Sequence, residues 1–169
     1  IAREALLAAH DTDLADVRLE LASACLKRGD HRAAEPLVHQ ALAAYERSVD
    51  GPSPGHAYAL TVRSDLYTHQ GSYAAATEAL QQALDERESL LEHHSPEVAR
   101  SYNKLGSAAW DQERYDDAIE LFMTALEIWG AVTERRSICS YEDGHVAALH
   151  NLALIYGDTG RSEEAKEYY

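Results

Sequence analysis

Histidine, cysteine and carboxylate side chains are the groups in this sequence that could bind a metal ion or act on a substrate. Nine histidines are present, but they form no His-Glu-x-x-His motif, and His93 and His94 are direct neighbours. Neighbouring residues on a helix do not face one site, so this pair predicts no metal centre. Cys25 falls among small residues that recur at a helical period, which favours a packing role over a nucleophilic one.

Other catalytic signatures are missing from the sequence as well. It contains no glycine-rich phosphate loop, no Gly-x-Ser-x-Gly elbow and no kinase motif. The many carboxylates are typical of helix faces exposed to solvent. We therefore expect no enzyme activity, no catalytic residue, no metal and no cofactor.

Charge and composition restrict the classes of partner. The formal net charge is −14, and we find no basic stripe of the kind that nucleic-acid binding needs. The same charge disfavours an anionic membrane surface, and no apolar run approaches the roughly 20 residues that span a bilayer. The charge fits a soluble protein whose partner, if charged, is basic, and solubility alone also accounts for it. Two distant cysteines and the absence of a signal peptide predict a cytoplasmic setting.

The elements that must position any site are helices arranged in a repeat. Glycine (9) and proline (4) are scarce and alanine is abundant, which predicts an all-α chain. Equivalent turn positions occur at 29, 71, 113 and 160, which are 42, 42 and 47 residues apart. The last interval holds five extra residues, which we place between about 131 and 145. A repeat of this length indicates one helical hairpin per unit.

Each unit combines a helix, a tight turn and a second helix. Three second helices carry the same stripe of alanine around a larger residue, at Ala34/Val38/Ala41, Ala76/Leu80/Ala83 and Ala118/Phe122/Ala125. In the first helices we assign packing roles to the residues at a helical period, namely Leu21, Ala22, Cys25, Leu60, Tyr67, Tyr102, Leu105, Gly106, Ala109, Leu149, Leu152, Ala153 and Tyr156. Glycine stands at three of the four turns, where a residue in the left-handed conformation commonly ends a helix. Asp30 and Ser72 are the expected N-caps of the helices that follow.

The repeat also sets the expected boundaries. Residues 6–15 match residues 90–99 at an offset of 84, so residues 1–12 should be the end of a preceding second helix and its loop. Repeat 1 then covers 13–56, repeat 2 covers 57–97, repeat 3 covers 98–145 with the insertion, and 146–169 is an incomplete repeat 4. Since the chain starts at Ile1 and stops within a helical pattern, we expect a fragment of a longer array.

These units resemble the tetratricopeptide repeat, and in particular the longer repeats of kinesin light chains. The motifs that carry the resemblance are Ala34-Glu35-Pro36-Leu37, Asn151-Leu152-Ala153 and Ala125-Leu126-Glu127-Ile128. Ser53-Pro54 and Ser95-Pro96 stand where kinesin light chains have His-Pro. Arg63 departs from the pattern, because the equivalent positions hold leucine; either its stem packs and its head reaches solvent, or its helix is rotated.

The resemblance implies a right-handed α-solenoid of stacked antiparallel hairpins, with the first helices lining a concave groove. By analogy, the exposed groove positions are Asp16, Leu19, Ser23, Lys27, Tyr58, Thr61, Asp65, His69, Arg100, Asn103, Ser107, Trp110, His150, Leu154 and Asp158. The implied function is a scaffold or adaptor module that binds a protein or peptide. We expect its partner-binding residues to be Tyr58, Asp65, His69, Arg100, Asn103, Ser107, Trp110 and His150.

Within that set, Trp110 is the expected anchor and Asn103 the expected ligand to a peptide backbone, since an amide is both donor and acceptor. The alternatives are a buried tryptophan and a solvated asparagine. Arg100 and Lys104 stand where co-chaperone repeats hold a C-terminal carboxylate, but Leu19, Ser23 and Val62 occupy the remaining clamp positions and cannot bind an anion.

Two further alternatives stay open. The repeats could regulate an attached domain in cis within a larger signalling or effector protein, instead of binding a partner in trans. The insertion near residues 131–145 could contribute to binding, or could be a longer second helix with an extended loop.

Overall fold

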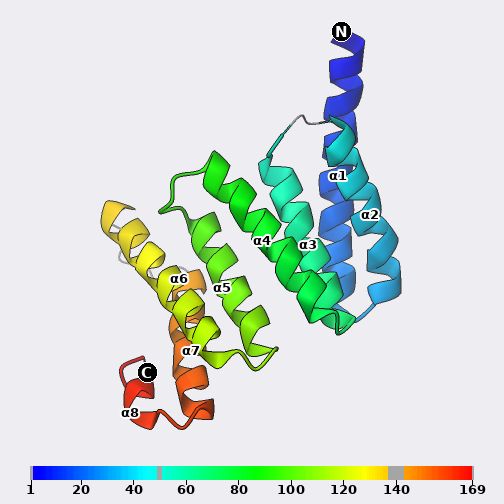
Figure 1. The fold of residues 1–169 in the computed structure, drawn as a ribbon. Coiled ribbons are helices and arrows are strands. Elements are labelled where there is room, and N and C mark those ends of the chain that lie inside the picture. Colours follow the sequence, from blue (N-terminus) through cyan, green and yellow to red (C-terminus); the bar gives the residue numbers. More distant parts are fainter. Residues whose placement is uncertain (1, 49–50, 137–142, 169) are drawn as a thin grey trace. The chain divides into compact units, whose positions relative to one another are not determined.

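The computed structural model describes the backbone of residues 2–48, 51–136 and 143–168, and the side chains of residues 11–48, 51–132, 144–161 and 163–168. Within these ranges all regular structure is α-helical, which confirms the predicted fold class (Figure 1). The helices are α1 (Ala2–Lys27), α2 (His31–Ser48), α3 (Pro54–His69), α4 (Tyr73–Leu90), α5 (Pro96–Trp110), α6 (Tyr115–Arg136), α7 (Asp143–Asp158) and α8 (Ser162–Ala165).

The chain divides into two compact units, Ile1–Leu90 and Leu91–Tyr169. In unit 1 the hairpins are α1/α2 and α3/α4, and α3 also packs on both α1 and α2. In unit 2 the hairpin α5/α6 is followed by α7, which packs on both of its helices, and by the short α8. Each unit therefore places two first helices side by side, α1 with α3 and α5 with α7.

The four hairpin turns share one backbone device. Gly29, Gly71 and Gly160 have φ of 78°, 73° and 73°, and Glu113 adopts the same left-handed conformation with φ of 60°. In each turn the next N–H returns to a carbonyl in the preceding helix, as in Asp30 N to Cys25 O at 2.9 Å and Arg114 N to Ala109 O at 3.0 Å. This is a helix end that glycine stabilises and glutamate tolerates at a cost.

Side-chain caps begin several helices. Asp30 accepts from Ala33 N at 3.1 Å, so its predicted role as N-cap of α2 is confirmed. Ser53 caps α3 and Ser95 caps α5, and each is followed by a proline in the first helical turn, where the missing N–H costs little.

α1 differs from the predicted boundaries, because it is one continuous helix from Ala2 to Lys27 and extends beyond α2 and α3 at its N-terminal end (Figure 1). The predicted loop before residue 13 is absent. The equivalent joints before α3 and α5 contain Ser-Pro, whereas residues 10–13 read His-Asp-Thr-Asp and contain no residue that must end a helix.

The register of α1 also corrects two predictions. Leu19, expected in the groove, is fully buried in the core of unit 1, while Leu21, expected in the core, is 53% exposed. Thr61 on α3 is likewise buried, and its hydroxyl donates to Ala57 O. α1 has apolar residues on two opposite faces, and the face with Ala15, Leu19, Ala22 and Leu26 is the one that packs, leaving Leu14, Val17 and Leu21 outside.

Three glycines allow an aromatic ring to approach a helix backbone closely. A Cβ on Gly106 of α5 would lie 2.6 Å from the Phe122 ring of α6. Gly55 of α3 faces the Tyr45 phenol of α2, and Gly144 of α7 faces the Trp129 ring of α6, with equally little space. In all three pairs a second helix supplies the ring and a first helix supplies the glycine.

The predicted insertion is partly accounted for. α6 has 22 residues and continues to Arg136, so the first part of the insertion lengthens this second helix. Residues 137–142, which include Ser140 and Tyr141, lie outside the described residues. Arg63 is half-buried and its guanidinium donates to Gln82 on α4 at 3.0 Å. Among the described helices, none is both long and apolar enough to cross a bilayer.

Candidate functional site

In unit 1 the face shared by α1 and α3 centres on Tyr58. The Tyr58 hydroxyl donates to Glu20 Oε1 at 3.2 Å, which links the two helices. Partial burial, the carboxylate of Glu20 and the charge of Asp65 together raise the pKa of Tyr58. Two acidic side chains from neighbouring helices therefore act on one phenol.

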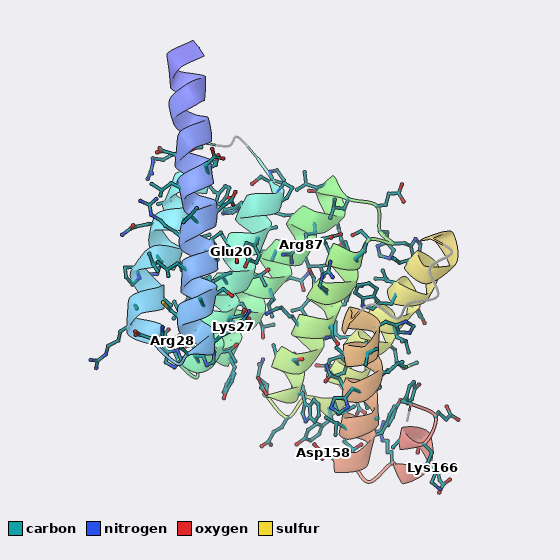
Figure 2. The ribbon with its side chains drawn as sticks, turned by 180° about the vertical axis from the view of Figure 1, so that it is seen from behind. Glu20, Lys27, Arg28, Arg87, Asp158 and Lys166 are labelled. Atoms are coloured by element: carbon teal, nitrogen blue, oxygen red, sulfur yellow. The ribbon has the colours of Figure 1, made fainter. Side chains whose placement is uncertain are left out.

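A small pocket lies further along the same face. It measures about 240 Å³ and is lined by Ser23, Leu26 and Lys27 of α1 and by Asp65, Thr68 and His69 of α3. Leu26 is buried and gives an apolar floor, whereas the other lining residues are polar or charged. Glu20 and Lys27 project from the side of α1 toward α3, about two turns apart (Figure 2).

His69 ends α3 beside this pocket. Its imidazole stacks on that of His31, the first residue of α2, with ring centroids 4.6 Å apart. The exposed His69 thus contributes to the packing between the two hairpins of unit 1 as well as to the pocket rim.

In unit 2 the face shared by α5 and α7 carries an amide pair. Asn151 Nδ2 donates to Asn103 Oδ1 at 3.2 Å, and these are the two asparagines of the chain. Each donates or accepts no other side-chain hydrogen bond within the described part of the chain. The pair therefore keeps one NH2 group and one carbonyl oxygen for a ligand, whichever amide is the donor.

The other predicted residues of α5 lie on the same helix as Asn103. Ser107 Oγ donates to the backbone oxygen of Asn103 at 3.1 Å, so its hydroxyl is turned toward its own helix. Trp110 is half-buried and packs edge-on against Phe122, with centroids 6.4 Å apart. It joins the core of unit 2 and still presents part of its ring to solvent.

Arg100 lies on α5, two residues before Tyr102, and its guanidinium contacts two other side chains. Its guanidinium is 5.6 Å from the ring centroid of the buried Trp129, and Nη2 donates to Glu97 at 3.2 Å. These contacts fix an exposed cation on the face of unit 2. On α7, His150 is exposed and Leu154 is 37% exposed.

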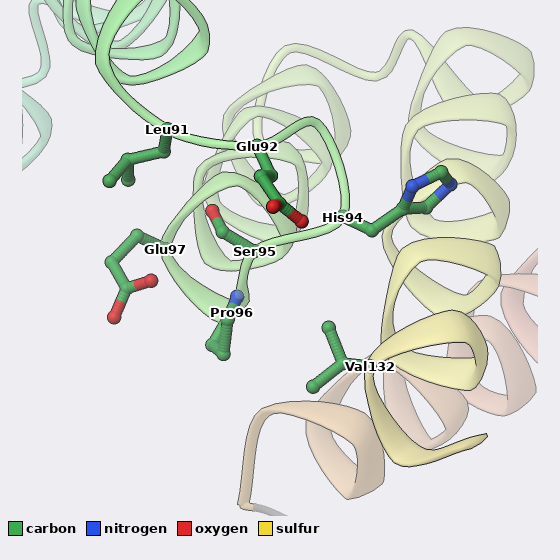
Figure 3. A pocket seen from close by; sticks show the side chains of 7 residues that line it. All are labelled: Leu91, Glu92, His94, Ser95, Pro96, Glu97 and Val132. Atoms are coloured by element: carbon green, nitrogen blue, oxygen red, sulfur yellow. The ribbon is translucent and has the colours of Figure 1, made fainter. Parts of the chain in front are cut away.

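A second pocket opens at the start of α5. It measures about 270 Å³ and is lined by Leu91, Glu92, His94, Ser95, Pro96, Glu97 and Val132. Figure 3 shows that the imidazole of His94 is directed away from the other six side chains. Ser95 is already used as the N-cap of α5 and Glu97 pairs with Arg100, so two of the polar groups at this pocket serve the helix itself.

The structure separates the predicted site residues into two sets. Tyr58, Asp65 and His69 belong to unit 1, and Arg100, Asn103, Ser107, Trp110 and His150 belong to unit 2. Sequence reasoning missed Glu20, Asn151 and Trp129. Asn151 was part of the Asn-Leu-Ala motif, and Glu20 is next to the wrongly assigned Leu19, so both could have been found with the correct helix register.

A metal site finds no support in the described residues, where no three histidine, cysteine or acidic side chains come together as ligands. Cys25 is half-buried and packs against the core of unit 1. Both observations concern the described part of the chain alone.

Comparison with protein families gives tetratricopeptide repeat models at residues 13–85, 59–131 and 146–169. A comparison with curated protein sequences gives no match. Among solved structures, kinesin-light-chain-type repeats from Podosopora anserina are similar at 19% identity and a TM-score of 0.63, covering 94% of this chain and 92% of that one.

Two further solved structures share the fold over parts of longer chains. A Rap protein in complex with competence and sporulation factor has a TM-score of 0.79 at 21% identity, and the match covers 94% of this chain but 41% of the Rap chain. PilF of Pseudomonas aeruginosa has a TM-score of 0.67 at 20% identity, over 92% of this chain and 58% of PilF. Identities this low establish the fold alone. With repeat models covering most of its length, the chain belongs to the tetratricopeptide repeat family, whose arrays are protein–protein interaction modules.

Proposed function

We propose that this chain is a scaffold or adaptor that holds an extended segment of a partner protein on the face of α5 and α7. The observation that carries the proposal is the Asn103–Asn151 pair. An extended peptide presents an N–H and a C=O in each residue, and the free NH2 and carbonyl of the amide pair are their complements.

The amide pair supplies orientation, and its neighbours supply affinity. A net hydrogen bond contributes about 0.5–1.5 kcal/mol, so two of them cannot hold a peptide alone. Trp110 presents an aromatic edge on the same helix, and Arg100 presents a cation held by Trp129 and Glu97. Tryptophan and arginine are the residue types that most often dominate protein interfaces. We assign anchoring roles to these two side chains.

The partner in this proposal is a protein or peptide in the cytoplasm, and not a nucleic acid or a membrane. The net charge of −14 supports this, because phosphate backbones and anionic lipids would be repelled. No catalytic step is assigned to the chain, since we identify no arrangement of nucleophile and base among the described residues of the two faces.

The first experiment uses the fact that the chain has two asparagines. A random dodecapeptide library is selected on the chain, and the strongest binder is titrated into protein carrying ¹⁵N in asparagine. Both side-chain NH2 pairs should shift on binding. Asn103→Leu and Asn151→Leu, which keep the shape of the side chain, should each weaken binding about tenfold. Unmoved asparagine signals would contradict the assignment.

A matched control comes from an amide outside this face. Gln40 is exposed on α2, so Gln40→Leu should leave the affinity unchanged. A second variant combines Trp110→Ala with Arg100→Glu and tests the anchors. Proteins that the parent chain captures from the native lysate should not be captured by this variant. If parent and variant capture the same proteins, the anchors lie elsewhere.

A second candidate function is regulation in cis, where the repeats hold a domain of their own polypeptide until a partner releases it. The observation that favours it is the Rap similarity, in which the match covers 41% of a longer chain. Peptides tiled across the natural gene product, displayed beside the random library, separate the two functions. If the strongest binder is one of the tiled peptides, regulation in cis is favoured; if it comes from the random library, the adaptor is favoured.

A further inference from the structure

α1 carries a second stripe of apolar side chains on the side that is turned to solvent. Leu14, Val17 and Leu21 are 39%, 64% and 53% exposed, and Ala24, three residues further on, is exposed as well. The described part of the chain exposes nine large apolar side chains, and the other six are divided among α4, α6 and α7. A single exposed apolar residue needs no explanation, whereas a continuous stripe marks an interaction surface.

The spacing of the stripe is that of a coiled-coil seam. Its residues follow one another by three, four and three positions, the alternation that keeps apolar residues between two helices that pack along each other. The opposite face of α1 is buried in the core of unit 1. The stripe is therefore presented on a helix that is already folded, and a second helix can bind it without the cost of ordering α1.

Two charged residues border the stripe on opposite sides. Asp13 directly precedes Leu14, and Arg18 directly follows Val17. In a parallel coiled coil these flanking positions meet across the seam, so that Asp13 of one α1 would face Arg18, five positions later, on another α1. Neither side chain forms an ion pair within the residues that the structure describes. Both charges are thus available to a second helix.

The antiparallel arrangement of two α1 helices lacks this charge complementarity. With all four apolar residues in contact, Arg18 would lie beside Arg18 and Glu20 beside Glu20 of the other helix, while Asp13 would lie near Lys27. Its like-charged pairs oppose its attractive ones. The parallel arrangement has two attractive pairs and no like-charged pair beside the seam, so the charges favour it.

We propose that α1 packs in parallel on α1 of a second copy of this chain, with the apolar stripe between the helices and Asp13 paired with Arg18 in both directions. The occupant is a second copy because one helix supplies both the stripe and the two complementary charges, as a symmetric interface requires. This contact is independent of the proposed function, because it uses unit 1 and leaves α5 and α7 unchanged.

Analytical ultracentrifugation of the intact chain, over a range of concentrations at physiological ionic strength, measures the association. The parent should be in equilibrium between monomer and dimer. Val17→Asp/Leu21→Asp puts two charges into the seam and should raise the dissociation constant of the dimer by about tenfold or more. The control Met123→Asp/Val146→Asp adds the same charges at exposed apolar positions of α6 and α7 and should leave the constant unchanged. Circular dichroism checks that all versions are equally helical.

An exchange of charges tests the pairing beside the seam. Arg18→Asp sets Asp13 against a second aspartate and should weaken association about tenfold. Asp13→Arg/Arg18→Asp restores opposite charges in reversed order and should return the dissociation constant to within about twofold of the parent. A double variant that stays as weak as Arg18→Asp would overturn the pairing.

Disulfide formation tests the direction of the two helices. Cys25 and Cys139 are first replaced by serine, and Ala24→Cys is then added. In the parallel dimer the two copies of residue 24 face each other, so mild oxidation should join them. In an antiparallel dimer they lie at opposite ends of the seam and should stay reduced. Ser72→Cys, exposed in the turn before α4, is the control for random collision.

Each of the other outcomes overturns the proposal. A parent that is monomeric at all concentrations would show that the stripe serves a helix of another kind. A dimer that persists in Val17→Asp/Leu21→Asp would place the contact on another part of the chain. Equal weakening by Met123→Asp/Val146→Asp would make net charge responsible, and a dimer without a crosslink at residue 24 would be antiparallel.

Discussion

The side-chain amide of Asn151 on α7 donates a hydrogen bond to the side-chain oxygen of Asn103 on α5, across 3.2 Å. Both residues are half-buried, so loss of one partner leaves a partly desolvated polar group. We expect Asn151→Ala to lower the free energy of unfolding by about 0.5–1.5 kcal/mol, measured by urea denaturation. Gln40→Ala on exposed α2 should change it by less than about 0.5 kcal/mol. Equal effects would mean that the hydrogen bond between the two side-chain amides contributes nothing to stability.

Glu113 is a glutamate in a position where the other three hairpins use glycine. Its φ of 60° is a conformation that costs side-chain-bearing residues about 1–2 kcal/mol. Glycine at this position would remove that cost, but part of the gain is offset because glycine has greater conformational freedom in the unfolded chain. Glu113→Gly should therefore stabilise the protein by about 0.5–1 kcal/mol in thermal unfolding. Glu127→Gly, inside α6, should instead destabilise by about 1 kcal/mol. A destabilised Glu113→Gly would show that the turn is not strained.

Gly106 has no room for a methyl group, because the Phe122 ring would lie 2.6 Å from its Cβ. Gly106→Ala must push the ring or separate α5 from α6, which we expect to cost about 1–3 kcal/mol of unfolding free energy. Gly157 on α7 is the matched control, since its Cβ would meet open space. Gly157→Ala should be stabilising by about 0.5–1 kcal/mol. If both substitutions stabilise, the close approach in the structure is wrong.

His145 on α7 links stability to pH. Burial lowers the pKa of His145 below its ordinary value, so the folded chain binds this proton less well than the unfolded chain. Its contribution to stability is therefore present above the ordinary histidine pKa of about 6.5 and is lost as the pH falls toward the lowered value. We expect the free energy of unfolding to fall less between about pH 7.5 and 5.5 in His145→Gln than in the parent. Equal pH slopes would exclude this residue as the cause.

The helical hairpins and their turns could be predicted because the rules behind them are local and repeat along the chain. Gly29, Gly71 and Gly160 mark helix ends by their own conformational preference, and Asp30 caps the next helix from three residues away. Four occurrences, spaced 42, 42 and 47 residues apart, leave little room for another assignment. The same locality explains the success of the predicted alanine stripes on the second helices.

The side-chain pairs of the two faces could not be predicted in this way. Leu19 and Leu21 lie on opposite apolar faces of α1, and only the packing of α2 and α3 decides which one is buried. Tyr58 with Glu20, and Asn103 with Asn151, are 38 and 48 residues apart and depend on how neighbouring first helices are aligned. An error of one position along α1 was enough to place Leu19 instead of Glu20 among the expected exposed groove positions.

The three contacts between glycine and an aromatic ring also have an evolutionary consequence. Gly55 with Tyr45, Gly106 with Phe122, and Gly144 with Trp129 each join a missing side chain on one helix to a bulky one on another. A larger residue at the glycine requires a smaller ring, and a smaller ring alone leaves a void that a side chain at the glycine position could fill. Among homologous sequences these six positions should vary as three coupled pairs. A larger residue at the glycine position of one helix should occur together with a smaller residue at the aromatic position of its neighbour.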